Sequence, residues 1–194
     1  MRKNNVVWLV VLWVCANVAF AQEKLVGLDY NPALKQLAGH ERNTNKSATV
    51  LQLPFFDDFS NYQGYPKDIL WADNHAFVNS SYGVFPPTVG VATLDALDAW
   101  GNLHAMATTS VFSADTLTSN IIRLDSLFTP YKKAVTVADS IYLSFYFQPG
   151  GGYGNMWERI GNAPSADDSL MLDLYDAGND KWNTVWASGG FDLD

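Results

Sequence analysis

Residues 140–148, with the sequence SIYLSFYFQ, decide the fold class. Their apolar side chains fall on every second position: Ile141, Leu143, Phe145 and Phe147. Successive side chains of a β-strand point to opposite faces, so this alternation is what a strand with one buried face produces. The stretch therefore predicts a strand over residues 140–148.

Six further stretches are short, rich in aliphatic and aromatic residues, and bounded by Gly, Pro, Asn or Asp. They are residues 52–59, 76–79, 89–94, 116–124, 169–175 and 182–187. No part of the chain between them carries a sustained apolar stripe of helical period. Many short strands without intervening helices predict an all-β fold, namely an antiparallel β-sandwich of the jelly-roll, concanavalin A-like kind.

The N-terminus has the pattern of a secretory signal peptide. Two basic residues precede an apolar run at 6–14, and small residues end it at 19–21, so we expect cleavage between Ala21 and Gln22. The run is shorter than the roughly 20 residues that cross a bilayer, so we expect no membrane span in the mature chain. Cys15 leaves a lipid anchor as the alternative, although bulky residues precede it.

Three regions follow from this pattern. Residues 1–21 are the expected signal peptide, and residues 22–50 are a polar, flexible leader that could hold a helical turn within 31–38. Residues 51–194 form the β-sandwich module.

Charge and cysteine content exclude several classes of function. The chain has 12 Lys and Arg against 20 Asp and Glu, a net charge of −8, and no basic cluster larger than Lys132-Lys133. Nucleic-acid binding needs clustered cations, so we expect no nucleic-acid partner. The single cysteine lies within the expected signal peptide, so the mature chain has neither a disulfide nor a thiol nucleophile.

The order of the strand sequences resembles a family of secreted Bacteroidota surface proteins, whose N-terminal module is MAM-like or concanavalin A-like. The stretches that carry the resemblance are residues 54–60 (PFFDDFS), Trp71, 77–79 (FVN), 86–95 (PPTVGVATLD), Gly101, 114–119 (ADTLTS), 139–146 (DSIYLSFY), 168–170 (DSL), Trp182 and Trp186.

This resemblance implies an exported protein at the outer-membrane cell surface or outside the cell, as cargo or accessory of type IX secretion and gliding motility. It also implies contact with the secretion machinery, and with a glycan or another surface protein. Proteins of that family are longer and end in a sorting domain. We therefore expect this chain to be an N-terminal fragment whose sandwich lacks its closing strands.

The sequence carries no catalytic signature. It has no G-x-S-x-G, H-E-x-x-H or P-loop motif, and its three histidines are at least 29 positions apart. Glu158 and Asp173 are the one carboxylate pair that we considered for a glycosidase. A non-catalytic adhesion, glycan-binding or assembly module is therefore the leading hypothesis. The alternatives are an accessory or scaffold domain of a secreted glycan or peptide hydrolase, and a structural spacer.

Adjacent acids at strand starts make calcium the one cofactor to consider. The candidate ligands are Asp57, Asp58, Asp167 and Asp168, because Ca²⁺ prefers carboxylate and carbonyl oxygens. The competing interpretation is that aspartates stabilise turns through their own backbone hydrogen bonds.

Aromatic residues outside the clearest strands are candidates for ligand binding. Trp71, Trp100 and Trp157 could stack on sugars or peptides, and Arg159 lies beside Trp157 in a Gly-rich loop. Packing in the core is the alternative for each tryptophan.

An Asp-Ser/Thr-aliphatic pattern occurs four times and resembles the acceptor pattern for O-glycosylation in Bacteroidota. The acceptors would be Thr116, Ser126, Ser140 and Ser169. The same pattern also arises wherever a turn leads into a strand.

Overall fold

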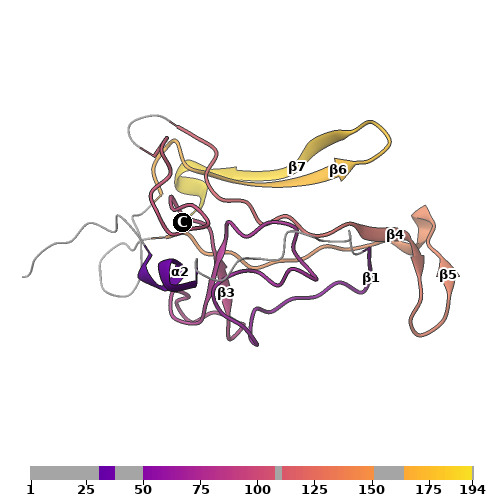
Figure 1. The fold of residues 1–194 in the computed structure, drawn as a ribbon. Coiled ribbons are helices and arrows are strands. Elements are labelled where there is room, and N and C mark those ends of the chain that lie inside the picture. Colours follow the sequence, from indigo (N-terminus) through magenta and orange to yellow (C-terminus); the bar gives the residue numbers. More distant parts are fainter. Residues whose placement is uncertain (1–30, 38–49, 108–110, 151–163, 194) are drawn as a thin grey trace, which may run out of the picture.

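Short strands joined by long loops make up the protein in a computed structural model that describes residues 31–37, 50–107, 111–150 and 164–193 (Figure 1). The strands are β1 (Leu51–Leu53), β2 (Phe77–Asn79), β3 (Val91–Thr93), β4 (Ile122–Leu127), β5 (Lys133–Ala134), β6 (Ser169–Asp176) and β7 (Lys181–Gly189). The helical elements of the described residues are the α-helix α2 (Pro32–Leu37) and the 3₁₀ helices η1 (Val137–Asp139) and η2 (Gly190–Leu193). The prediction of an all-β fold is confirmed.

The strands form three small sheets. β6 and β7 form an antiparallel hairpin, β2 pairs antiparallel with β3, and the third sheet has the order β1-β4-β5. β1 runs parallel to β4, so the expectation of antiparallel pairing throughout is wrong for this pair. The jelly-roll arrangement of these sheets stays a prediction.

Three of the expected strands differ from those observed. Residues 140–148 form no strand with any described residue, although the chain there is extended. β1 ends before Pro54, which has no N–H to donate to a ladder. The strand expected at residues 116–124 begins only at Ile122, and β5 was not predicted.

The buried core of the described residues is small and gathers around β2. Ala76 and Val78 are fully buried, and Phe77, Leu97 and Ala99 are nearly so. Most of the large apolar side chains elsewhere remain partly exposed. The best-packed part of the molecule is therefore the region where β2, the loop after β3 and α2 meet.

The helical turn expected within residues 31–38 is confirmed, and it packs against the core. Asn31 caps α2, because its Oδ1 accepts hydrogen bonds from the backbone N of Ala33 at 2.9 Å and of Leu34 at 3.3 Å. Pro32 occupies the first helical position, where its missing N–H is of no consequence. Leu34 is only 2% exposed, so this part of the leader is docked.

The described residues contain no helix that is both long enough and apolar enough to cross a membrane. The expected signal peptide and its cleavage site at Ala21 and Gln22 lie outside the described residues.

Candidate functional site

An exposed tryptophan stands on a tight loop after β3. The ring of Trp100 is 62% exposed, while its neighbour Ala99 and the preceding Leu97 are buried. A large apolar ring left in water beside a well-packed core is the kind of exposure that needs an explanation. The loop of residues 98–102 is therefore the starting point of the site.

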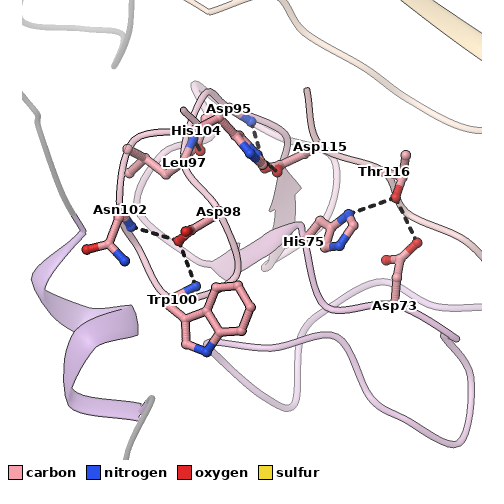
Figure 2. Close-up of polar contacts among 10 residues, drawn as sticks. All are labelled: Asp73, His75, Asp95, Leu97, Asp98, Trp100, Asn102, His104, Asp115 and Thr116. Carbon is pink, nitrogen blue, oxygen red and sulfur yellow. Dashed lines mark hydrogen bonds and ion pairs between the residues drawn. The ribbon is translucent and has the colours of Figure 1, made fainter. Parts of the chain in front are cut away.

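The loop's conformation is set by one carboxylate. Asp98 Oδ1 accepts hydrogen bonds from the backbone N of Trp100 and of Asn102, both at 2.9 Å (Figure 2). The backbone of Asp98 also pairs with both ends of the turn, accepting from Gly101 N at 2.8 Å and donating to Asn102 O at 2.7 Å. These four hydrogen bonds hold the backbone on either side of the ring.

Two hydrogen bonds join the loop to other segments of the chain. The backbone N of Asn31 donates to Gly101 O at 2.8 Å, and the Tyr65 hydroxyl donates to Ala99 O at 2.9 Å. Gly101 has a φ of +75°, and a Cβ there would lie 2.7 Å from the carbonyl oxygen of Asn31. Only glycine fits both the backbone conformation and the close approach of α2.

A buried carboxylate lies beside the loop. Asp115 Oδ1 is 3.3 Å from His104 Nε2, and Asp115 Oδ2 accepts a hydrogen bond from the backbone N of Asp95 at 3.0 Å (Figure 2). The Asp115 side chain is only 1% exposed, and this burial raises its pKa to about 6. Burial also raises the pKa of Asp95, whose own carboxylate accepts from the backbone N of Leu97 at 2.7 Å.

A second polar group ties the loop before β2 to the segment after Asp115. Thr116 Oγ1 donates to Asp73 Oδ2 at 3.0 Å and lies 3.1 Å from His75 Nδ1 (Figure 2). Asp73 Oδ2 also accepts from the backbone N of Thr118 at 2.8 Å. Its other oxygen, Oδ1, is buried and has no hydrogen-bond partner among the described residues.

The sequence around the site is uniformly acidic. Residues 68–122 contain five aspartates and no glutamate, lysine or arginine. The five are Asp68, Asp73, Asp95, Asp98 and Asp115. A negative potential attracts cations and repels anions, so the site disfavours anionic ligands.

Trp71 has a packing role. Its Nε1 donates to Asp57 Oδ2 at 2.7 Å, and its ring stacks on Phe59 with centroids 5.9 Å apart. The edge of Phe55 meets the same indole at 5.4 Å. Of the predicted platforms, Trp100 is exposed and Trp71 is half-buried, while Trp157 and Arg159 lie outside the described residues, as does Glu158 of the predicted carboxylate pair.

Three of the four predicted calcium ligands accept hydrogen bonds within their own turns. Asp57 accepts from the backbone N of Phe59 and from Tyr62 and Trp71, and Asp58 accepts twice from Ser60. Asp168 accepts from the backbone N of Ser165, and Asp167 is exposed. Within the described residues no three His, Cys, Asp or Glu side chains come close enough to hold a metal. These contacts fit the competing interpretation, in which the aspartates stabilise their own turns.

The four predicted glycosylation acceptors occupy different environments. Ser140 and Ser169 are exposed, and Ser126 is half-buried in β4 opposite Ala134. Thr116 is exposed, but its hydroxyl is engaged with Asp73. Modification of these residues stays a prediction.

The sequence reasoning missed the group formed by Asp95, His104 and Asp115. These residues are separated by nine and eleven positions and match no motif, and the fold alone brings them together. The one available signal was the run of aspartates without a lysine or arginine. Comparisons of the chain with protein-family models, with curated proteins and with solved structures found no match.

Proposed function

We propose that this protein is a non-catalytic, exported adhesion module that binds glycans through Trp100. The observation that carries the proposal is the 62% exposure of the Trp100 ring on a loop held by hydrogen bonds on both sides. Binding residues commonly sit on loops that a rigid scaffold positions. A loop whose backbone is already held in place loses little freedom when a ligand arrives, and this preorganisation favours binding.

The chemistry of the loop suits a sugar. A pyranose ring has an apolar face that can stack on an indole, and hydroxyl groups at its edge that need hydrogen-bond partners. The half-buried Asp98 and the exposed Asn102 lie on the same loop as the indole and offer acceptors and a donor (Figure 2). Because residues 68–122 carry no cation, the expected ligand is a neutral glycan rather than an acidic one.

Export, the jelly-roll arrangement and service to type IX secretion or gliding motility belong to the same proposal. They rest on the N-terminal sequence pattern and on the resemblance to secreted Bacteroidota surface proteins. A module at the cell surface would meet glycans and other surface proteins, which fits an adhesive role.

The alternative is an accessory domain of a secreted hydrolase. The raised pKa of Asp115 is a feature that catalytic acids share. However, this carboxylate is 1% exposed and faces His104 and the backbone of Asp95, so it has no path to a substrate. If the protein binds a glycan without hydrolysing it, the adhesion module is favoured; hydrolysis of the bound glycan would favour the alternative.

The test is binding to immobilised and soluble polysaccharides. We expect the wild type to bind one or more neutral glucans, xylans or chitin-type oligomers, and not polygalacturonate. Trp100→Ala should weaken binding at least about tenfold, because burial of one large apolar side chain contributes about 1.5–3 kcal/mol. Phe85→Ala is the matched control, since Phe85 is 99% exposed on a different loop. Equal binding by Trp100→Ala and Phe85→Ala, or no glycan binding at all, would overturn the proposal.

A further inference from the structure

Residues 141–148 form a segment whose backbone pairs with no other described residue. It runs through the molecule without belonging to a sheet (Figure 1). Among the described residues, no backbone hydrogen bond joins this segment to another part of the chain. Extended chain with free N–H and C=O groups is a template on which a further strand can pair.

The segment is nevertheless held in place. Phe145 and Phe147 pack on Trp186 of β7, with ring centroids 5.5 and 5.6 Å apart. At its C-terminal end, Gln148 Oε1 accepts a hydrogen bond from the backbone N of Val84 at 2.9 Å. At the other end, Ile141 lines a cavity of about 260 Å³ together with residues of β1 and β4. The backbone groups that pair with no described residue therefore belong to a segment that is anchored at both ends.

The exposed fractions of the side chains in residues 141–148 alternate in the same way as the apolar residues in the sequence. The side chains at odd positions, Ile141, Leu143, Phe145 and Phe147, are 44–62% exposed, whereas Tyr142 and Tyr146 are 83–88% exposed. The odd positions are thus the less exposed set, and Phe145 and Phe147 among them contact Trp186, whereas the two tyrosines are the more exposed set. A strand added at this edge must keep the same two faces, because a slip of one residue would exchange them.

We infer that residues 141–148 pair antiparallel with the same segment of a second copy of this chain, with Ser144 opposite Ser144 at the two-fold axis. This register places Tyr142 opposite Tyr146 of the second copy on the solvent face. It also places Leu143 opposite Phe145 and Ile141 opposite Phe147 on the inner face. A symmetric dimer needs one self-complementary surface, which a strand of this pattern supplies.

The lack of charge on this segment and its exposed apolar area favour a second copy of the chain as its partner. Residues 140–150 contain no Asp, Glu, Lys or Arg, so two copies can approach through this edge although each chain carries a net charge of −8. The six large apolar side chains of the segment expose on the order of 800 Å² in total, and cross-strand pairing with a second copy would cover part of this area. Aromatic and aliphatic cross-strand pairs stabilise such a ladder.

The first test is the mass of the protein in solution, measured by light scattering and sedimentation between micromolar and hundreds of micromolar concentration. We expect a dimer in the wild type and slower amide exchange of residues 142–146 as the concentration rises. Ser144→Pro removes the N–H of the central residue and introduces a ring that strands inside a sheet do not accommodate, and should raise the dimer dissociation constant at least tenfold. Ser144→Ala keeps that N–H and is the matched control. A monomer at every concentration, or a dimer that survives Ser144→Pro, would overturn the inference.

A second pair of variants tests the register and does not depend on a proline being tolerated. Tyr142→Lys with Tyr146→Lys places like charges opposite each other across the two-fold axis and should abolish the dimer. Tyr142→Lys with Tyr146→Glu places opposite charges there and should restore it. Both side chains are exposed in the single chain, so the two double variants should have the same monomer stability. Loss of the dimer in both, or in neither, would contradict the pairing.

Discussion

Replacing Gly101 by alanine should destabilise the protein and displace Trp100. The backbone of Gly101 has a φ of +75°, which an L-residue such as alanine adopts at a cost of roughly 1–2 kcal/mol. The new Cβ would also lie 2.7 Å from Asn31 O and 3.0 Å from Leu34 Cβ, so the loop or α2 must move. That movement strains the 2.8 Å hydrogen bond from Asn31 N to Gly101 O, which contributes about 1 kcal/mol.

The expected loss is therefore about 2–3 kcal/mol. Urea unfolding followed by tryptophan fluorescence measures it directly. Gly189→Ala is the control, because a Cβ at Gly189 would lie no closer than 3.4 Å to its neighbours; we expect a change of less than about 1 kcal/mol there. If Gly101→Ala were as stable as Gly189→Ala, α2 would not hold the loop of residues 98–102. Trp100 would then not stand on a fixed backbone.

Two further predictions concern proton and metal binding. Because burial raises the pKa of Asp115 to about 6, its native carboxyl keeps a proton that the unfolded chain has lost, so this group destabilises the fold as pH rises from about 4 to about 6. The difference in melting temperature between Asp115→Asn and the wild type should therefore grow in favour of Asp115→Asn over that pH range and stay constant above it. If the difference instead fell, the ion pair between Asp115 and His104 would dominate. Since Asp57 and Asp58 already accept hydrogen bonds from their own turns, millimolar Ca²⁺ should leave the melting temperature unchanged, and a rise that Asp58→Asn removes would establish a calcium site.

Local signals in the sequence were sufficient for some elements of the fold. The two strands of the β6–β7 hairpin were predicted because each is a contiguous run of strand-forming residues, and Ala177-Gly178-Asn179-Asp180 between them favours a turn. A helical turn within residues 31–38 was allowed for, and the structure shows that Asn31 caps it and Pro32 begins it. In these cases the residues that decide the structure are neighbours in sequence.

Pairing between distant segments could not be read from the sequence. The alternation in residues 140–148 predicted a strand, and the structure pairs this segment with no described strand, because alternation does not specify which segment lies alongside. The parallel pairing of β1 with β4 joins segments about 70 residues apart, and no local pattern specifies it.

In the candidate site, too, the local signal was visible in the sequence and the long-range packing was not. Trp100 was found because a tryptophan outside the strands is a visible signal in the sequence. Trp71 gave the same signal but packs among Phe55, Phe59 and Asp57. The burial that distinguishes the two rings arises only when distant segments meet.

The most direct test of Trp100 as a glycan platform is an NMR titration of the protein labelled with ¹⁵N-tryptophan. The indole resonance of Trp100 is the one that disappears in Trp100→Phe. On addition of neutral hexasaccharides of the cellulose, xylan and chitin types, the proposal predicts that this resonance shifts while that of Trp71, bonded to Asp57, stays in place. A Trp100 resonance that remains unmoved while the protein binds any of these sugars would contradict the proposal, and so would the absence of binding to all of them.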